Sequence, residues 1–413
     1  MNQLNICYVC PYSLSKFGGV QNQVLELAKR AALEGHNVTI LAPNSRKDSI
    51  VTVISNGVEV KIPIVSVGRA VPIPIGRGTV SPLAICYVSR LREILTTGGF
   101  DVVHVHEPVA PSIGPLACNY TVKDSLLVTT SHTNIKPNLA TWMYSTFGRM
   151  VGGDHMLDDV NLRLAVSPAA ANRANHYLPN EYRIIPNGID AERFSPNVTP
   201  FEEYLDGKIN ILFVGRMGDN ELRKGLFYLV SAYNEVHWQH PNTRLLLVGP
   251  GEPDWRTREL VHATDHEDII FIGPVSFNDL PRWYATADVF ASTPTDGESF
   301  SLVDLEGMAA RKPVLTSNIE GPRDVLLGFV RYGPEVVCPR VYEAKAGILV
   351  QPRDIPGIAE GLEILVTDEN KRREMGMHGR QIVLETFSLD VVVPELLGAY
   401  VSAFESRKAA ISV

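Results

Sequence analysis

Two series of alternating strand and helix patterns constrain the fold of this chain more than any other feature of its sequence. Apolar runs such as "LNICYVCP" and "NVTILAP" predict buried strands, and the amphipathic stretch "GVQNQVLELAKRAALEG" between them predicts a helix. The linker "SPNVTPFEEYLDGK" interrupts the series, and the alternation restarts at "INILFVGR". Because parallel strands joined by helices form doubly wound sheets, the sequence predicts an α/β protein with two Rossmann-like domains facing a central cleft.

The chain length supports this division, since 413 residues exceed what one hydrophobic core organises. We expect an N-terminal domain at residues 1–195, a linker at 196–208 and a C-terminal domain at 209–385. The final segment, 386–413, carries the amphipathic pattern "DVVVPELLGAYVSAFESRKA". It is expected to form a helix that packs back on the first domain.

Composition excludes several classes of protein. Hydrophobic residues make up 45% of the chain, as in an ordinary globular protein, and no apolar run is long enough to span a bilayer. The N-terminus lacks the pattern of a secretory signal, so we expect a cytoplasmic protein. The net charge of −8 combines a slightly basic first half with an acidic second half. This distribution argues against a nucleic-acid partner and leaves room for an anionic ligand or surface on the first half.

Neither the cysteines nor the histidines predict a metal site. Cys7 and Cys10 lie in one predicted strand with side chains on opposite faces, and no second cysteine pair completes a zinc site. Buried free thiols are therefore expected. His104 and His106 share one strand face and precede Glu107, but no clear third or fourth ligand accompanies them. We expect no metal and no cofactor.

Two positions in the sequence suit an anionic ligand. Gly18 and Gly19 join a strand to a helix, where unpaired N–H groups can bind an anion, although a glycine pair on its own favours a plain tight turn. The fingerprint G-x-G-x-x-G is absent. Arg216 and Lys224 follow the strand "INILFVGR" and could hold a diphosphate, or could be solvated surface cations. Arg223 is expected to be merely solvated.

Glu298 and Glu306 stand eight residues apart in "DGESFSLVDLEGMAARKPVLTS". A loop is expected at Glu298, followed by a helix that Ser299 caps. Eight helical residues rise by about 12 Å, too far for two carboxylates that share a proton. Ionised carboxylates accept hydrogen bonds only, so the spacing indicates contacts with hydroxyls at two ends of one extended ligand.

Taken together, these motifs resemble the retaining GT-B glycosyltransferases of family four, in the family's order over nearly the whole chain. The matching stretches are "GGVQNQVLELAKRAALEGHNVTILAP", "DVVHVHEP", "IPNGID", "FVGRM" with "RKG", "LLLVGPG" and "GESFSLVDLEGMA". Within that family, "CPYSLSKFGGVQNQV", "GRAVPIPI", "VHVHEPVAPSIG" and "SHTNIKPN" are most similar to the phosphatidylinositol mannosyltransferases.

The resemblance implies a role for each matching residue. Arg216 and Lys224 would hold the diphosphate of a nucleotide sugar, Glu298 the hydroxyls of the transferred sugar and Glu306 those of the ribose. The donor site is expected to comprise Gly18, Gly19, Arg216, Lys224, Glu298, Ser299, Phe300, Ser301 and Glu306. His132 would lie at the reaction centre, and Gln21 with His132 would meet the acceptor. No Asp-x-Asp motif is present, so these cations would act without a metal ion.

The sequence also departs from the family's pattern. Ser301 and Arg311 stand where the family has glycine, which leaves the choice of donor open. An apparent insertion at 327–344 is a surface elaboration or a specificity element.

The implied activity is transfer of a hexose, mannose from GDP-mannose, to an inositol phospholipid at the cytoplasmic membrane face. Residues 61–93 would bind anionic lipid through Arg69, Arg77, Arg90 and Arg92. Within this stretch we expect a proline-broken loop and then a helix with Ser81 at its N-cap and Pro82 in its first turn. The alternative for this stretch is an ordinary crossover helix with solvated arginines. The rival functions are transfer to a soluble sugar or polysaccharide, a sugar-nucleotide epimerase, and a binding protein without turnover.

Overall fold

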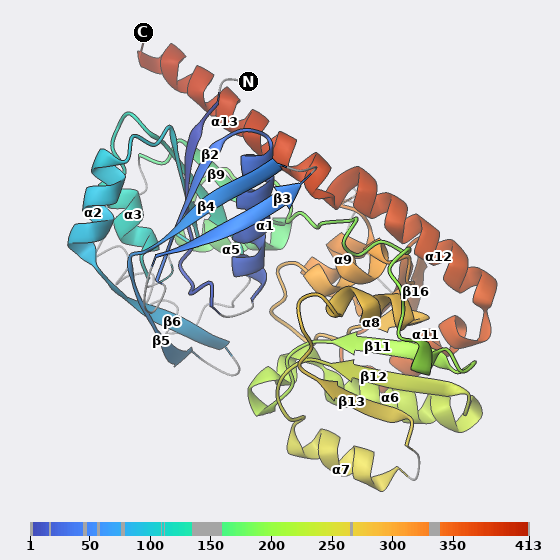
Figure 1. The fold of residues 1–413 in the computed structure, drawn as a ribbon. Coiled ribbons are helices and arrows are strands. Elements are labelled where there is room, and N and C mark those ends of the chain that lie inside the picture. The colour runs from blue at the N-terminus through green and yellow to red at the C-terminus, as the bar shows by residue number, and fades with distance from the viewer. Residues whose placement is uncertain are drawn as a thin grey trace. The chain divides into compact units, whose positions relative to one another are not determined.

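The computed structural model describes residues 3–15, 18–43, 48–55, 58–75, 79–108, 110, 112–133, 159–264, 267–329 and 339–411 (Figure 1). The chain forms two compact units. Unit 1 holds most of the chain up to Gly188 together with Leu389–Val413, and unit 2 consists chiefly of Ile189–Ser388. The first division falls slightly before the expected domain end at residue 195.

Unit 1 is built on an eight-stranded sheet in the order β10-β9-β8-β7-β1-β2-β4-β3. All neighbouring strands are parallel except β3, which runs antiparallel to β4 at the sheet edge. The strands are β1 Asn5–Val9, β2 Asn37–Ala42, β3 Ser49–Ser55, β4 Val58–Ser66, β7 Val102–His106, β8 Leu126–Ser131, β9 Leu162–Ala165 and β10 Arg183–Ile184. The helices are α1 Gly19–Leu33, α2 Val88–Thr97, α3 Gly114–Tyr120, α5 Pro168–Tyr177 and α13 Leu389–Ile411.

The sheet of unit 1 is covered on both faces, because successive side chains of a strand point to opposite sides. Cys7 packs in one apolar cluster with Leu91, while Cys10 packs in the other with Val24. Both thiols are free and buried, as predicted. The second cluster also receives buried side chains from α13, which confirms that the C-terminal helix packs on the first domain. These include Val392, Val393, Leu396, Leu397 and Tyr400.

Unit 2 repeats the architecture with a seven-stranded sheet in the order β13-β12-β11-β14-β15-β17-β16, parallel except for β16. Together the two units confirm the prediction of two Rossmann-like sheets. The strands are β11 Ile209–Val214, β12 Thr243–Val248, β13 Ile269–Gly273, β14 Val289–Ala291, β15 Val314–Ser317, β16 Val341–Ala344 and β17 Gly347–Val350. The helices are α6 Leu226–Gln239, α7 Trp255–Ala263, α8 Leu280–Thr286, α9 Leu302–Ala309, α10 Glu320–Leu326, α11 Ile355–Thr367 and α12 Glu369–Ile382, with short turns η1 Glu202–Tyr204, η2 Asp219–Lys224 and η3 Val383–Phe387.

The chain passes between the units at Gly188–Ile189 and again at Ser388–Leu389, and these two points are neighbours. The N–H of Ile189 donates to the carbonyl of Phe387 at 2.8 Å, and Ile189 forms a parallel bridge with Ser388. On the other side of the crossing, a Cβ on Gly188 would lie 2.7 Å from a methyl carbon of Leu389. The two crossings therefore run side by side in close contact.

The structure overturns the secondary structure expected within residues 61–93. In place of a proline-broken loop, strand β4 is followed by β5 (Gly68–Ile75) and β6 (Thr79–Cys86), which pair as a two-stranded sheet. Strands with a free edge tolerate proline, because the missing N–H can face outward. Pro72 and Pro74 are two residues apart, so both lack a donor on the same edge. The predicted helix start at Ser81 and Pro82 is also wrong, since both lie in β6 and α2 begins at Val88.

Candidate functional site

The candidate residues of unit 2 gather at the carboxyl ends of β11 and β14. Lys224 ends the turn η2, and Gly225 follows it with φ of +73°, a conformation that favours glycine. A Cβ at Gly225 would lie 1.8 Å from the carbonyl oxygen of Thr293, in the loop after β14. The close approach of these two backbones brings Lys224 beside Glu298.

Glu298 is a carboxylate held by two cations. Its Oε1 lies 2.6 Å from the Lys224 ammonium and 2.5 Å from the Arg223 guanidinium, and its side chain is only 15% exposed. Burial alone would raise its pKa, but the charges and hydrogen bonds of Lys224 and Arg223 outweigh burial and hold that pKa at about 2. The side chain is therefore ionised at neutral pH and acts only as an acceptor.

The structure contradicts the expectation that Arg223 is merely solvated. Its guanidinium contacts Glu298 and lies 3.5 Å from Glu221, and its carbonyl accepts the N–H of Thr295. Arg223 therefore joins η2 to the loop that carries Glu298. Adjacent cations in a sequence do not reveal which of them a turn will direct inward, so no sequence signal identified this contact.

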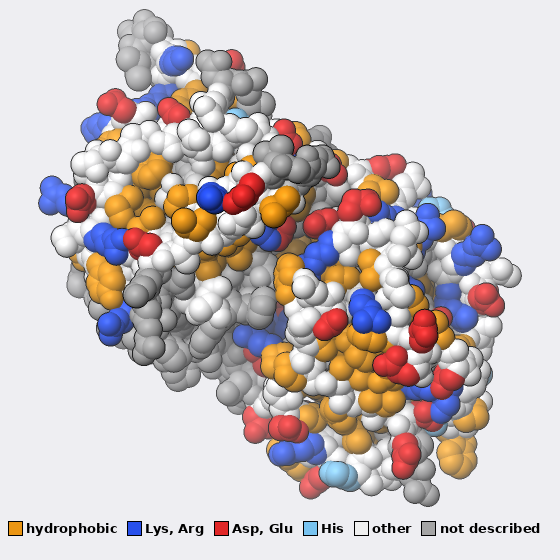
Figure 2. Space-filling view, viewed as in Figure 1, with side chains coloured by type: hydrophobic (Ala, Val, Ile, Leu, Met, Phe, Trp, Pro, Cys, Tyr) orange, Lys and Arg blue, Asp and Glu red, His pale blue; other side chains and the backbone are white. Residues whose placement is uncertain are grey.

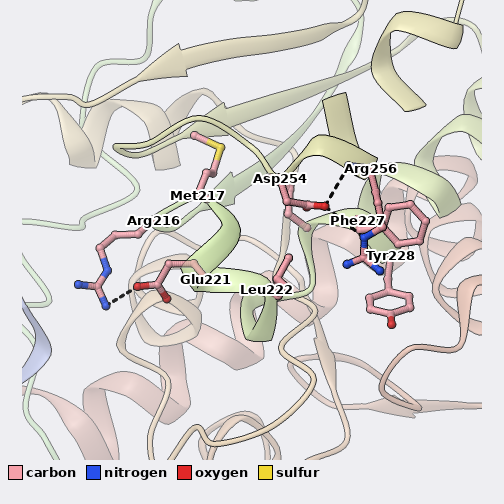
Figure 3. A pocket seen from close by; sticks show the side chains of 10 residues that line it. Arg216, Met217, Glu221, Leu222, Phe227, Tyr228, Asp254 and Arg256 are labelled. Atoms are coloured by element: carbon pink, nitrogen blue, oxygen red, sulfur yellow. Dashed lines mark hydrogen bonds and ion pairs between the residues drawn. The ribbon is translucent and has the colours of Figure 1, made fainter. Parts of the chain in front are cut away.

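Arg216 lies on the rim of a small recess (Figure 3). Its guanidinium pairs with Glu221 at 2.8 Å, and its side chain is 56% exposed. The recess lies at the carboxyl ends of β11 and β12, where doubly wound sheets bind ligands. Arg216 is thus accessible to an anion. The recess is lined by Arg216, Met217, Gly218, Glu221, Leu222, Leu226, Phe227, Tyr228, Asp254 and Arg256.

Glu298 lies in the loop and Glu306 in helix α9, as the sequence indicated. The hydroxyl of Tyr284 donates to Glu306 Oε2 at 2.6 Å. Burial raises the pKa of Glu306 to about 7, although the Tyr284 hydrogen bond opposes the shift. Glu306 thus already has one of the hydrogen-bond partners that a buried carboxyl requires.

Helix α9 begins later than expected. Ser301, rather than Ser299, occupies its N-cap position, and Ser301 makes no side-chain cap because its hydroxyl bonds to Asp304. The Phe300 ring packs against Phe329 and Phe387, so only the main chain of Phe300 is left for a ligand.

Asp304 was not singled out from the sequence. It is fully buried and accepts hydrogen bonds from Ser292 at 2.6 Å and Thr316 at 3.0 Å. Burial raises the pKa of Asp304 to about 7. Its contacts tie α9 to the ends of β14 and β15. Only the periodicity of the helix, which places it on the inward face, could have indicated this position.

In unit 1, Gly18 and Gly19 lie at the start of α1, as expected. Gly18 occupies the N-cap position, and the first turn of α1 contains no acidic residue. The Gln21 side chain folds over Gly18, because a Cβ there would lie 2.4 Å from Gln21 Oε1. The helix N-terminus is therefore positive, and Gln21 lies beside it.

His132 follows β8 and is buried between neighbouring polar groups. Its Nε2 lies 2.8 Å from His106 Nδ1, and its main-chain N–H donates to Glu107 Oε1 at 2.5 Å. Burial lowers the pKa of His132 to about 3, so the imidazole is neutral. His106 and Glu107 were considered as metal ligands in the sequence, but their contacts here are with His132.

No cluster of three potential metal ligands occurs in the described part of the chain. His104 has both ring nitrogens engaged, by the Tyr400 hydroxyl at 2.7 Å and the Thr130 hydroxyl at 2.6 Å. It therefore has no lone pair available for a metal in this arrangement.

The basic residues expected at a membrane lie at the surface of unit 1. Arg69 donates to the Tyr87 hydroxyl at 3.1 Å, Arg90 pairs with Asp48 at 2.6 Å, and Arg92 lies over the Tyr120 ring. Arg77 lies outside the described residues. None of the described helices is both long enough and apolar enough to cross a bilayer.

The outer face of β3 adds apolar surface to unit 1. Ile50 and Ile54 are 63% and 73% exposed. Figure 2 shows hydrophobic side chains interspersed with charged ones over the part of unit 1 where Figure 1 places β3 and β4.

Comparison with known proteins identifies relatives for both units. Residues 17–193 match the family model "Glycosyltransferase Family 4", and residues 208–368 match "Glycosyl transferases group 1". The chain is 30% identical over 401 residues to a phosphatidyl-myo-inositol mannosyltransferase of Mycobacterium tuberculosis, covering 96% of each protein. It is 32% identical over 326 residues to the protein of that name from Propionibacterium freudenreichii, covering 78% of this chain and 79% of the relative. The crystal structure of a glycosyltransferase from Rickettsia africae matches with a TM-score of 0.69 at 20% identity, covering 98% of this chain and 99% of that one, which supports the fold.

Proposed function

This chain belongs to glycosyltransferase family 4 and is a hexosyltransferase, and from that premise we propose that it transfers mannose from GDP-mannose to a hydroxyl of an inositol phospholipid. The observation that carries the proposal is similarity, over nearly the whole chain, to proteins named phosphatidyl-myo-inositol mannosyltransferase. The transfer retains the anomeric configuration and takes place at the cytoplasmic face of the membrane, with the protein bound peripherally.

In this proposal the donor binds through the residues clustered in unit 2. Arg216 and Lys224 hold the diphosphate, and the ionised Glu298 accepts hydrogen bonds from hydroxyls of the sugar. Glu306 accepts hydrogen bonds from the ribose. The ion pair between Lys224 and Glu298 supports these roles. One ammonium beside the carboxylate can bind the diphosphate and also hold Glu298 where it accepts hydrogen bonds from the sugar. Gly18 and Gly19 add the positive end of α1.

Catalysis then depends on stabilising charge at the leaving group. Negative charge grows on the diphosphate as the sugar leaves, so fixed cations that bind it more tightly in the transition state accelerate the reaction. The departing diphosphate helps to deprotonate the acceptor hydroxyl, and His132 lies beside the sugar as a neutral group. We propose that Arg216, Lys224 and helix N-termini perform this role without a metal ion.

Turnover with defined acceptors tests the proposal. The full chain is incubated with GDP-mannose and either vesicles containing phosphatidylinositol, soluble sugars or no acceptor, each with and without a chelator. Mannosylated lipid in the vesicle sample alone, unchanged by the chelator, is the expected result. Transfer to soluble sugars alone would support the rival acceptor class. Conversion of the donor without acceptor would indicate an epimerase.

A further inference from the structure

The conformation and burial of Glu107 destabilise the fold of unit 1. Glu107 follows β7 directly and has φ of +51°, a left-handed backbone conformation that is strained for a residue with a side chain. The residue is only 3% exposed, and none of the ion pairs described for this chain includes it. Burial raises its pKa to about 7. Strain and a buried acid do not stabilise a fold, so their presence calls for another explanation.

The contacts of Glu107 point to that explanation. Its Oε1 accepts the main-chain N–H of His132 at 2.5 Å, and its Oε2 accepts the hydroxyl of Thr133 at 3.3 Å. The main-chain N–H of Thr133 also donates to this carboxyl group. Both residues belong to the segment that leaves the carboxyl end of β8. The main-chain N–H of Glu107 donates to the carbonyl of Thr130 at 2.8 Å, and this hydrogen bond fixes the left-handed turn. The carboxyl group therefore holds the backbone of His132 and Thr133 from the neighbouring strand.

His106 holds the His132 side chain in the same way. The two imidazoles are joined by the 2.8 Å contact between Nδ1 of His106 and Nε2 of His132, and their rings stack with centroids 5.1 Å apart. On its other side, the His106 ring stacks on His104 at 4.3 Å. His104 in turn is fixed by Thr130 and by Tyr400 of α13. The His132 ring thus lies at one end of a buried column of three imidazoles.

We propose that Glu107 and His106 are positioning residues for His132, Glu107 acting on its main chain and His106 on its ring. Neither is expected to touch the substrate. The relevance to catalysis rests on the proposed function, which places His132 at the reaction centre. The positioning of His132 by Glu107 and His106 does not depend on that function. A misplacement of His132 by about 1 Å would lower kcat by up to roughly 100-fold.

Hydrogen exchange in the full chain tests the positioning without any substrate. Glu107→Leu should speed exchange at the amides of His132 and Thr133, while Glu107→Gln, whose amide oxygen still accepts an N–H, should restore slow exchange. His106→Leu should leave those amides protected. Ser125→Ala is the matched control, because it removes a buried hydrogen bond from the Ser125 hydroxyl to the Phe100 carbonyl at the start of β8, the opposite end of the strand from His132. Unchanged exchange in Glu107→Leu would overturn the assignment, as would equally fast exchange in Ser125→Ala.

Kinetics test the consequence for catalysis. Glu107→Leu and His106→Leu should lower kcat by roughly 10- to 100-fold while leaving the Kd for GDP, which the proposed function places in unit 2, unchanged. His106→Asn should recover part of the activity, because its amide oxygen or nitrogen can occupy the place of Nδ1, and His106→Gln should not. A uniform loss in all variants including Ser125→Ala would indicate a purely structural role. Altered exchange with no mannosyl transfer by the wild-type chain would refute the proposed function and leave the positioning intact.

Discussion

Glu298 shows how a carboxylate stays charged inside a folded unit. Lys224 and Arg223 lower its pKa from an ordinary value of 4.5 to about 2. A group whose pKa is lower in the folded state adds stability above its unfolded pKa, and that stability is lost as pH falls through the folded pKa. The contribution of Glu298 is therefore complete near pH 7 and disappears between roughly pH 5 and pH 2.

This gives a prediction for acid unfolding. Glu298→Gln should lower the free energy of unfolding at pH 7, because it removes the carboxylate that pairs with two half-buried cations. The variant should also lose less stability than the wild type between pH 5 and pH 2. Urea unfolding across this pH range measures both effects. Equal losses of stability in the two proteins over this pH range would show that Lys224 and Arg223 do not lower the pKa of Glu298.

Removal of Arg216 or Lys224 should weaken the binding of a nucleoside diphosphate. Each variant, Arg216→Ala and Lys224→Ala, loses a charge-assisted contact of about 1.5–3 kcal/mol. Arg216 is largely exposed, so its removal should leave the stability of unit 2 unchanged, whereas Lys224→Ala should also destabilise it through Glu298. Calorimetry with GDP and thermal unfolding separate these effects. Wild-type affinity in both variants would rule out the assigned diphosphate site.

The two glutamates should differ in the part of the donor that they affect. Glu306→Gln is expected to lower the affinity for GDP as much as the affinity for GDP-mannose, because its proposed partner is the ribose. Glu298→Gln is expected to leave the affinity for GDP unchanged and to reduce both the affinity for GDP-mannose and the rate of transfer. Titration of each variant with both ligands provides the measurement, and the opposite pattern would exchange the two roles.

Sequence reasoning located single residues well where a local pattern carried the information. The opposite faces of Cys7 and Cys10 follow from strand periodicity, and Glu298 and Glu306 lie in the loop and helix that their surroundings indicate. Arg223 was misjudged because its partner is distant in sequence. Asp304 was overlooked for a similar reason, since its partners come from two other strands.

Among the elements, the β5–β6 ribbon shows where pattern reading fails. The segment "VPIPI" alternates with the period of a strand, but its two prolines indicate a loop unless the strand has a free edge. Whether a strand lies at an edge depends on the whole sheet and cannot be read locally. The consecutive strand–helix pairs of both sheets were predictable because each buried strand carries its own apolar run.

The elements around α2 should bind anionic membranes. Each basic residue near an anionic surface contributes about 1 kcal/mol, screened by salt. Reversal of Arg69, Arg77 and Arg90 to Glu should abolish co-sedimentation with vesicles that contain anionic lipid and leave GDP binding intact. Part of the effect of Arg90 will reflect loss of its pair with Asp48.

Lys123→Glu provides a control outside the stretch 61–93. This variant should retain vesicle binding and its decrease with rising salt. Equal binding of the wild type to neutral and anionic vesicles, or none to either, would favour a soluble acceptor.

For the whole molecule, unit 1 should depend on the last helix of the chain. Leu396 of α13 is 2% exposed in the core of unit 1, so Leu396→Ala should reduce the stability of that unit by about 2–5 kcal/mol. Among the described residues, the apolar core cluster of unit 2 includes none from α13, so unit 2 should be unaffected. Hydrogen exchange of both units in moderate urea measures the difference. Ser402→Ala, at an exposed position of the same helix, should change neither unit, and a loss spread equally over both units would contradict the prediction.

The side-by-side crossings at Gly188–Ile189 and Ser388–Leu389 have a consequence for synthesis on the ribosome. The stretch Ile189–Ser388, which forms nearly all of unit 2, lies between them without interruption, so it can fold as soon as it has emerged. Unit 1 is synthesised first but lacks α13 until that helix is translated. Until then, its apolar surface around Tyr8 and Val24 is not covered by Leu396 and Tyr400. Exposed surface of this kind promotes aggregation of incomplete chains. The half of the molecule that is made first is therefore the half that is completed last, and nascent chains stalled before residue 389 should be the ones that require chaperones.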